Sequence, residues 1–366
     1  MKKKAIKKAI LTGGGRATRL HPLTTTTNKH LLPLANKPMI FHAIEKAVEA
    51  GIEEIFINLN PGEQVLHKHI GDGGRWGIKI EYFEQTGGPQ GIPHIVKEGE
   101  KFIGDDPFML YLSDNVLLGG LTDMIDYFNS SDKDCMLALS TVRDPERFGV
   151  PVFNEKQELI DVLEKPENPP NNFAVTGIYL YGPKVFFDAY KKIKKSARGE
   201  YEISDIHSEF LKKGLKVGHK EITGWWKDTG KSHDLLIASQ LLMDGMKEDE
   251  YVKQGTVHED TTMNGSVHVS HGTTIGKNVV LHGPVIIAEN CILEDCEIGP
   301  HVTIGAGSTV KQATVKNSIV LEHATINTPM KIIDSLIGRR AQLIKRDTNA
   351  PEGHKMIIGD KTIIEM

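Results

Sequence analysis

The chain has 366 residues, of which 39% are hydrophobic and 25% are charged, a composition typical of a folded protein with two or three domains. Its 44 Lys and Arg against 48 Asp and Glu give a formal net charge of -4, which argues against nucleic-acid binding because such proteins usually carry a basic face. The three cysteines are too few for a disulfide framework, and no apolar run reaches the roughly 18 residues of a membrane helix. We therefore expect a reduced, cytoplasmic protein without nucleic-acid or membrane partners.

The first part of the chain, to about residue 245, alternates strand and helix signals, beginning with a short buried strand at residues 9–11 that runs into glycines. Residues 38–50 predict a helix, because aliphatic residues recur every four positions between a first-turn proline and a terminating glycine. With the next apolar run this makes a βαβ opening, which predicts a mostly parallel sheet covered by helices. Further strands are expected at residues 55–57, 108–112, 136–142 and 175–181.

After about residue 256 the helical periodicity ends, and aliphatic residues recur at every sixth position instead. A six-residue period fits neither a helix nor a hairpin, whereas it is typical of a parallel β-helix whose hexapeptides each form one face of a triangular coil. At about 18 residues per coil there is room for roughly five coils, and a β-sandwich with accidental spacing is the alternative. The recurring positions are Val269, Ile275, Leu281 and Ile287, followed after a slip of register by Ile298, Ile304 and Val310.

Three consecutive glycines at residues 13–15 follow the first strand, and the cations Arg19 and Lys29 come soon after them. Glycine backbones can approach a polyphosphate closely, and successive N–H groups form an anion nest, so this combination suits a triphosphate. The P-loop motif is absent, and the dinucleotide fingerprint fails because Thr18 stands where its last glycine belongs. Taken alone, the glycines would fit a plain tight turn equally well.

A series of short motifs then runs through the N-terminal region. In chain order they are Asn36-Lys37-Pro38, Glu84-Gln85, Gly91-Ile92-Pro93-His94, Leu112-Ser113-Asp114-Asn115, Phe148-Gly149-Val150, Glu164-Lys165-Pro166, Thr176-Gly177, Gly199-Glu200-Tyr201-Glu202 and Gly224-Trp225-Trp226-Lys227-Asp228. This region resembles the sugar-1-phosphate nucleotidylyltransferases. The last motif, the repeats and the ending at residues 353–360 are most similar to the long-form glucose-1-phosphate thymidylyltransferases.

The resemblance implies an α/β fold, with a Rossmann-like, GT-A-like mixed sheet followed by a C-terminal left-handed parallel β-helix of hexapeptide repeats. It implies a nucleotidyltransferase catalytic domain at residues 1–245, a linker at 246–256 and a β-helix domain with a C-terminal tail at 257–366. The implied reaction is nucleotidyl transfer from dTTP or UTP to α-D-glucose 1-phosphate, giving dTDP-glucose or UDP-glucose and pyrophosphate. Because the attacking phosphate is already an anion, positioning and charge stabilisation matter more than a general base.

The resemblance also assigns roles to charged residues. Asp114, at the end of an expected strand, and Asp228, in a distant loop, are implied to hold the catalytic Mg²⁺, an ion that prefers oxygen ligands. Arg19 is implied to stabilise the departing pyrophosphate, and Lys29 to neutralise the triphosphate. For such lysines and arginines, solvated surface charge is the ordinary alternative.

The substrates are expected to contact a further set of residues. By resemblance Lys165 grips the sugar phosphate and Glu164 hydrogen-bonds the sugar hydroxyls. A site built to hydrogen-bond a pyrimidine rejects other bases, because its polar groups would otherwise stay unpaired. The other implied substrate-binding residues are Gly14 and Gly15 at the phosphates, Gln85 and Gly91 at the base, and Asn115, Gly149, Thr176, Gly177 and Trp226 around the sugar.

The sequence departs from the family pattern at a glycine position, and alternative functions remain open. Ala17 stands where the family usually has Gly, which is tolerated if its φ is negative. The chain could be another sugar-1-phosphate nucleotidylyltransferase, could add acyl transfer in the β-helix, or could be a regulatory subunit with a dead site. By analogy with other β-helices we also expect a homo-oligomer, a trimer through the β-helix or a multiple of it. The β-helix histidines relevant to acyl transfer are His271, His282, His301 and His323.

Overall fold

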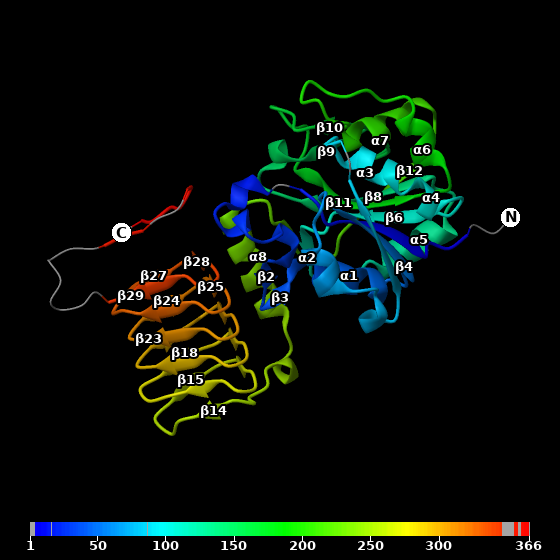
Figure 1. The fold of residues 1–366 in the computed structure, drawn as a ribbon. Helices are drawn as coiled ribbons and strands as arrows, with labels where there is room; N and C mark the ends of the chain where they lie inside the picture. The colour runs from blue at the N-terminus through cyan, green and yellow to red at the C-terminus, as the bar shows by residue number, and fades with distance from the viewer. Residues whose placement is uncertain (1–3, 16, 86, 346–354, 358–359, 366) are drawn as a thin grey trace. The chain divides into compact units, whose positions relative to one another are not determined.

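The structure is a computed structural model that describes residues 4–15, 17–85, 87–345, 355–357 and 360–365 (Figure 1). It divides into two compact units, each made of two stretches of chain: Met1–Arg16 with Met39–Asp228, and Ala17–Pro38 with Thr229–Met366. These units differ from the expected division at residue 245, because one N-terminal segment and the last long helix group with the β-helix. Part of the expected C-terminal tail lies outside the described residues.

The first unit is built on a mixed sheet, in which nine strands of the described residues are hydrogen-bonded. Its central strand, β1 (Lys8–Thr12), pairs in parallel with β4 and β6, which confirms the predicted parallel βαβ opening. Antiparallel strands are added on the far side of β6, so the sheet is mixed. The other strands are β4 (Glu54–Leu59), β5 (Lys79–Glu84), β6 (Phe108–Tyr111), β8 (Cys135–Thr141), β9 (Gly149–Phe153), β10 (Leu159–Glu164), β11 (Phe173–Tyr181) and β12 (Val217–Glu221).

Helices cover this sheet, whose central strands are buried along almost their whole length. The first helix, α1 (Met39–Glu49), begins one residue after Pro38 and presents its apolar stripe to the core. Gly51, at φ 84°, follows the end of the helix, as the sequence pattern predicts. The remaining helices of this unit are α2 (Val65–Ile70), α3 (Ile92–Glu98), α4 (Glu100–Ile103), α5 (Thr122–Ser130), α6 (Val185–Tyr190) and α7 (Ile203–Lys212).

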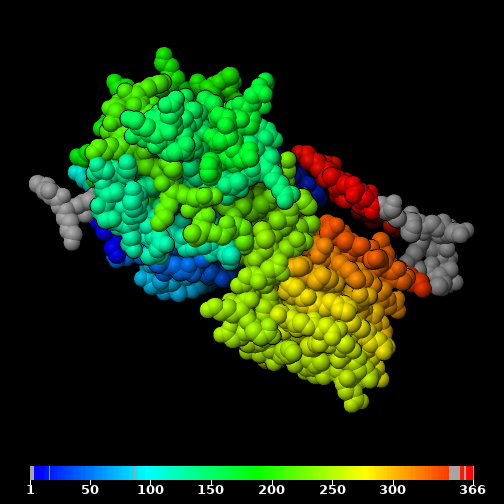
Figure 2. All heavy atoms as spheres, turned by 180° about the vertical axis from the view of Figure 1, so that it is seen from behind, coloured from blue at the N-terminus to red at the C-terminus, as the bar shows by residue number. Residues whose placement is uncertain are grey.

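The second unit contains the predicted left-handed parallel β-helix, whose rungs stack as layers from yellow to orange (Figure 2). In its described residues three parallel sheets of six, five and five strands form the faces, in agreement with about five coils. The first face has β14 (Thr256–Val257), β17 (Thr274–Ile275), β20 (Ile292–Glu294), β23 (Thr309–Lys311), β26 (Thr325–Asn327) and β29 (Gln342–Ile344). The second has β15 (Thr262–Asn264), β18 (Val280–His282), β21 (Glu297–Ile298), β24 (Thr314–Lys316) and β27 (Lys331–Ile333). The third has β16 (Val267–Val269), β19 (Val285–Ile287), β22 (Val302–Ile304), β25 (Ser318–Val320) and β28 (Leu336–Ile337).

The recurring aliphatic residues form columns along the β-helix axis. On the third face Val269 pairs with Ile287, Ile287 with Ile304, and Ile304 with Val320. These side chains are fully buried. The slip of register after Ile287 reflects five-residue steps at some corners, which keep each column in line.

The rest of the second unit lies outside the β-helix itself. A hairpin of β2 (Pro33–Leu34) and β3 (Lys37–Pro38) follows three short 3-10 helices, η1 (Thr18–Leu20), η2 (Leu23–Thr25) and η3 (Lys29–Leu31). The hairpin packs against α8 (Ser232–Gly245), the longest helix of the structure (Figure 1). Among the described residues, no helix is sufficiently long and apolar to span a bilayer.

Candidate active site

The glycine loop begins at the carboxyl end of β1 and is held by two asparagines from the neighbouring strand β4 and its following turn. The backbone N–H of Gly13 donates to Asn58 Oδ1 at 2.9 Å, and that of Gly15 donates to Asn60 Oδ1 at 2.8 Å. A Cβ on Gly14 would lie 2.6 Å from Asn58 Nδ2, so the loop can pass the asparagine only because it is glycine. Gly15, at φ 117°, is exposed.

The two predicted metal-binding aspartates come together through a short antiparallel ladder in the first unit. The ladder joins β7 (Asn115–Leu117) to β13 (Trp226–Asp228), and its register sets Asp228 opposite Asn115, the neighbour of Asp114. The same edge of the sheet carries the glycine loop, because the N–H of Ser113 donates to Thr12 Oγ1 at 2.9 Å. Both carboxylates are half-buried. Asp114 lies just beyond the carboxyl end of the parallel strand β6, where α/β sheets bind their ligands, and Asp228 ends the antiparallel strand β13.

Asn115 is the centre of the hydrogen bonds beside these carboxylates. Its Nδ2 donates to Asp114 Oδ1 at 3.0 Å. Its Oδ1 accepts from the N–H of Gly177 at 3.0 Å and from Trp226 Nε1 at 2.9 Å. Since a Cβ on Gly177 would lie 2.7 Å from Asn115 Cγ, the structure brings four predicted site residues into direct contact here.

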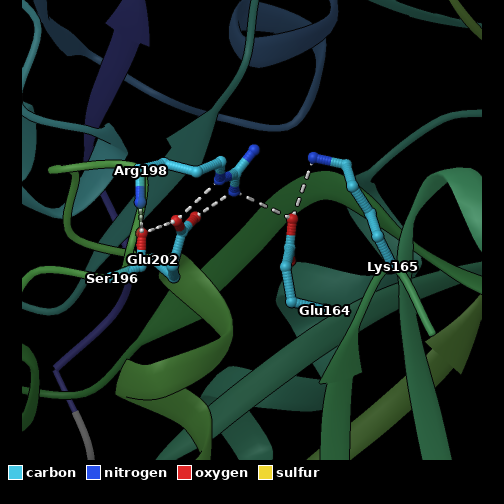
Figure 3. A network of polar contacts seen from close by, with 5 residues as sticks. All are labelled: Glu164, Lys165, Ser196, Arg198 and Glu202. Atoms are coloured by element: carbon cyan, nitrogen blue, oxygen red, sulfur yellow. Dashed lines mark hydrogen bonds and ion pairs between the residues drawn. The ribbon is translucent and has the colours of Figure 1, made fainter.

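A second polar group forms around Glu164 at the end of β10 (Figure 3). Glu164 Oε1 lies 3.0 Å from Lys165 Nζ and 3.6 Å from Arg198 Nη2. Arg198 in turn donates to both oxygens of Glu202, at 2.6 and 3.1 Å, and these hydrogen bonds raise the pKa of its guanidinium. Gly149 pairs with Glu164 in the register of β9 and β10, so it lines the same group.

The segment expected to contact the base meets the loop that carries Arg198. Gly91, at φ 90°, precedes helix α3, and a Cβ on it would lie 2.1 Å from the carbonyl oxygen of Tyr201. The N–H of Tyr201 also donates to the carbonyl oxygen of Gln90 at 2.9 Å. Gln85 directly follows β5, where its N–H donates to Leu59 O at 3.0 Å. Thr176 is fully buried, and its hydroxyl donates to Ala138 O at 3.0 Å within the sheet.

Arg19 and Lys29 belong to the second compact unit, within residues 17–38, which we call the cation segment. Arg19 is exposed on η1, and Lys29 is half-buried at the start of η3. Ala17 has φ 43°, a left-handed conformation that L-residues adopt only with strain. The negative φ under which its methyl group would be tolerated is therefore not observed. The structure thus brings the aspartates and the sugar-side residues together within the first unit, while the two cations lie in the second.

Several residues with evident structural roles at this site were not anticipated from the sequence. Asn58 and Asn60 alternate with leucine at the end of β4, a pattern that an apolar strand alone would not require. Arg198 stands in an exposed loop next to a recognised motif, so its charge could have been noted. Asn58 Nδ2 is buried against Gly14 and has no hydrogen-bond partner in the described part of the chain, which leaves a donor directed to the loop.

The donor set can be tested against the implied metal. Within the described residues no group of three or more His, Cys, Asp and Glu side chains could hold an ion. Two carboxylates, Asp114 and Asp228, fit Mg²⁺ nonetheless, because this ion is usually held by one or two carboxylates, substrate phosphates and waters. Two of the β-helix histidines lie beside carboxylates of the second unit: His301 Nε2 is 2.7 Å from Asp244 Oδ1 of α8, and His282 Nε2 is 3.5 Å from Glu297 Oε1.

Comparison with known proteins identifies the family of the chain. The nucleotidyl transferase family profile matches residues 8–245, and the GMPPB C-terminal domain profile matches residues 281–365. The chain is 36% identical over 361 residues to the low-salt glycan biosynthesis nucleotidyltransferase Agl11 of Haloferax volcanii, covering 98% of this chain and 100% of the relative. It is 32% identical over 360 residues to a glucose-1-phosphate thymidylyltransferase of Streptomyces antibioticus, covering 98% and 99%.

A solved structure also resembles the chain. It is a Bacillus anthracis protein provisionally designated a glucose-1-phosphate thymidylyltransferase, in complex with sucrose. It superposes with a TM-score of 0.60 at 37% identity, over 64% of this chain and 94% of that chain. The chain belongs to the nucleotidyl transferase family. Within that class it is a sugar-1-phosphate nucleotidyltransferase, an enzyme that joins a nucleotide to a sugar phosphate.

Proposed function

We propose that this enzyme transfers a thymidylyl group from dTTP to α-D-glucose 1-phosphate, forming dTDP-glucose and pyrophosphate, with UTP as the second nucleotide. The relatives named glucose-1-phosphate thymidylyltransferase support this substrate pair, including one that matches over almost its whole length. The observation that carries the proposal is the β7–β13 ladder, which joins Asp228 to the Asp114 side of the sheet beside the glycine loop.

The reaction joins two polyanions. A phosphate oxygen of the sugar 1-phosphate attacks the α-phosphorus of the triphosphate, the bond to the β-phosphate breaks, and pyrophosphate leaves with its electron pair. The backbone at Gly14 and Gly15 suits the triphosphate, because glycine lets phosphates approach closely and the asparagines that accept from Gly13 and Gly15 hold the loop in a fixed arrangement. Arg19 stabilises the leaving pyrophosphate in this mechanism, and Lys29 offsets charge near the reacting phosphorus.

Asp114 and Asp228 are the residues that would hold Mg²⁺, which supplies charge neutralisation between the phosphate groups when bound. The chain's own contribution is to orient them. Asp114 is fixed through the amide of Asn115, which is itself fixed by Gly177 and Trp226. A carboxylate held this way loses little freedom when a ligand binds.

The sugar phosphate fits the group around Glu164. Glu164 is paired with Lys165 and Arg198, so a phosphate entering between the two cations would compete for them. Glu164 would then be released to accept hydrogen bonds from sugar hydroxyls. Glu202 keeps two hydrogen bonds to Arg198 and holds the guanidinium in place.

Base selection rests on Gln85 and on the backbone at Gly91. The tight contact between Gly91 and the Tyr201 backbone fixes the loop against which a pyrimidine would lie. The variant Gln85→Ala should raise the KM for dTTP by about tenfold and leave that for glucose 1-phosphate nearly unchanged. Equal effects on both constants would remove Gln85 from the base pocket.

The test of the proposed function is a pyrophosphate-release assay over a grid of substrates. The grid pairs dTTP, UTP, CTP, ATP and GTP with the 1-phosphates of glucose, galactose, mannose and N-acetylglucosamine. We expect the highest kcat/KM for dTTP with glucose 1-phosphate. No release with any pair would overturn the proposed reaction, and a preference for a purine or another sugar would overturn the substrate assignment.

A further inference from the structure

The cation segment, residues 17–38, forms one compact unit with α8 and the β-helix, although it follows directly on the glycine loop in sequence. It carries Arg19 and Lys29, the two cations that the proposed function assigns to the triphosphate. What holds this segment therefore bears on catalysis, and several contacts that hold it lie within the second unit.

The β2–β3 hairpin is the most regular part of the segment. Its strands pair Leu34 with Lys37, and the two residues of its turn, Ala35 and Asn36, have φ 48° and 61°. Positive φ at both positions is the geometry of a type I′ turn, in which asparagine is favoured. The hairpin starts two residues after the end of η3, the short helix that carries Lys29.

The tip of this hairpin is hydrogen-bonded to the β-helix. Asn36 Nδ2 donates to the carbonyl oxygen of Ile304 at 3.0 Å and to that of Ile286 at 3.4 Å. These carbonyls belong to β22 and β19, which pair with each other on the third face. One side chain therefore spans two adjacent rungs of the β-helix.

Further contacts of the segment are with α8 and the same face. The N–H of Ala35 donates to Ser239 Oγ at 3.1 Å, and Ser239 is buried on α8. Nearer its start, the segment contributes Leu23 and Leu32 to a small apolar pocket that it shares with Ile319 of β25. Polar and apolar contacts thus attach both ends of the segment.

Burial distinguishes this face from another face of the β-helix. The middle residue of each rung on the third face points away from the axis, yet Ile286 is 6% exposed and Ile319 is 4% exposed. On the first face, Ile292 also points outward and is 46% exposed. Apolar outward residues are buried where α8 and the cation segment attach, as expected for a face that serves as a support.

We propose that the β-helix positions the catalytic cations, and that Asn36 is the positioning residue through which it does so. This inference rests on the proposed function, since it requires Arg19 and Lys29 to act on the triphosphate. The β-helix then fixes the conformation of the segment that carries Arg19 and Lys29. Loss of the Asn36 hydrogen bonds leaves the cations present but displaced, which lowers turnover because charge stabilisation depends steeply on position.

The test compares Asn36→Gly with Asn278→Gly in the full chain. Both asparagines have positive φ, 61° and 52°, so glycine introduces no backbone strain at either site. Asn278 Nδ2 donates to Asp295 Oδ1 at 2.8 Å on a β-helix corner, which makes it a matched control. We expect Asn36→Gly to lower kcat for pyrophosphate release at least about tenfold without changing the KM for glucose 1-phosphate, and Asn278→Gly to stay within about twofold.

Hydrogen exchange gives the second readout. Amides of residues 29–36 should exchange faster in Asn36→Gly than in Asn278→Gly, and Ser239→Ala, which removes the acceptor of the Ala35 N–H, should shift kcat in the same direction. Faster exchange with unchanged kcat would overturn the proposal, as would equal losses of activity in the two glycine variants. If Asn36→Gly does not fold, an unchanged kcat in Ser239→Ala overturns it. A wild-type enzyme that releases no pyrophosphate would instead refute the proposed function.

Discussion

The sheet of the first unit and the β-helix of the second build their cores from different materials. The sheet core packs large aromatic rings in varied geometries, such as Tyr181 against Phe186 at 5.1 Å and against Phe210 at 6.0 Å. In its described rungs the β-helix core consists of stacked aliphatic residues with a few small side chains, the same position being filled in turn after turn. An irregular core can place unlike residues at each strand end, whereas a repetitive core offers uniform faces.

This difference between the cores is matched by a difference in what the two units carry. The varied strand ends of the first unit carry the aspartates, Asn115 and the Glu164 group, each at one position only. The β-helix repeats its backbone carbonyls at every rung, so a single asparagine side chain can bond two of them. The first unit presents the carboxylates, and the second presents a regular surface that holds the segment carrying the two cations.

The largest expected effect comes from the carboxylates of the first unit. Asp228→Asn keeps the size and shape of the side chain but removes its charge, so kcat should fall about a hundredfold to a thousandfold. The measurement is pyrophosphate release at saturating dTTP and glucose 1-phosphate, with the melting temperature taken in parallel. The matched control is Asp126→Asn on the exposed side of α5, which should retain full activity. Near-normal turnover in Asp228→Asn would show that this carboxylate is not a metal ligand.

The sequence was sufficient to predict the β-helix, because its signal is local and repeated. Each hexapeptide places an aliphatic residue on the axis. One irregular corner shifts the spacing by a residue, but the six-residue period resumes in the next rung, so the repeat is still recognised. The attachment of residues 17–38 to this domain could not be predicted in the same way. It depends on Asn36 meeting carbonyls about 250 residues later in the chain, a pairing that no periodicity encodes.

The candidate site shows the same limit. Asp114 and Asp228 were assigned by resemblance, and the structure adds the ladder that brings them together. Asn58 and Asn60 escaped notice because an asparagine at a strand end is usually a turn residue, and only the folded backbone shows that both accept from the glycine loop. A residue that hydrogen-bonds to backbone groups of a distant segment is hard to recognise from sequence, because its partner has no characteristic side chain.

The contrast between the two cores can be tested with one substitution made in each. Leu110 in β6 and Leu281 in β18 are both fully buried, and replacing either with alanine should cost about 2–5 kcal/mol of unfolding free energy. The three tryptophans, Trp76, Trp225 and Trp226, all lie in the first unit, so their fluorescence monitors the sheet. Leu110→Ala should shift the fluorescence transition in urea. Leu281→Ala should shift mainly the far-ultraviolet circular dichroism transition, and a common shift in both variants would mean that the units unfold together.

Alanine substitutions at two glycines can separate the effect of a steric collision from the effect of backbone strain. Gly91 and Gly88 have φ 90° and 78°, but only Gly91 lacks room for a Cβ. Gly91→Ala should raise the KM for dTTP by about tenfold, because its methyl group would displace the Tyr201 backbone. Gly88→Ala carries the conformational strain without the collision and should change this KM by less than about threefold. Equal changes would mean that strain, not the contact with Tyr201, governs the loop.

A pH dependence of stability is expected from the buried His207 of α7. Burial lowers the pKa of His207 to about 3, so the folded protein keeps the ring neutral while the unfolded chain takes up a proton near its ordinary value. The unfolded state is therefore favoured as the pH falls from about 6.5 toward 3, and stability should drop by about 1.4 kcal/mol per pH unit from this group. His207→Gln should lower stability at neutral pH, because Tyr181 loses a partner 3.0 Å away, yet flatten the acid dependence of the tryptophan-monitored transition. An identical slope in the wild type and the variant would show that another group causes the acid sensitivity of the sheet.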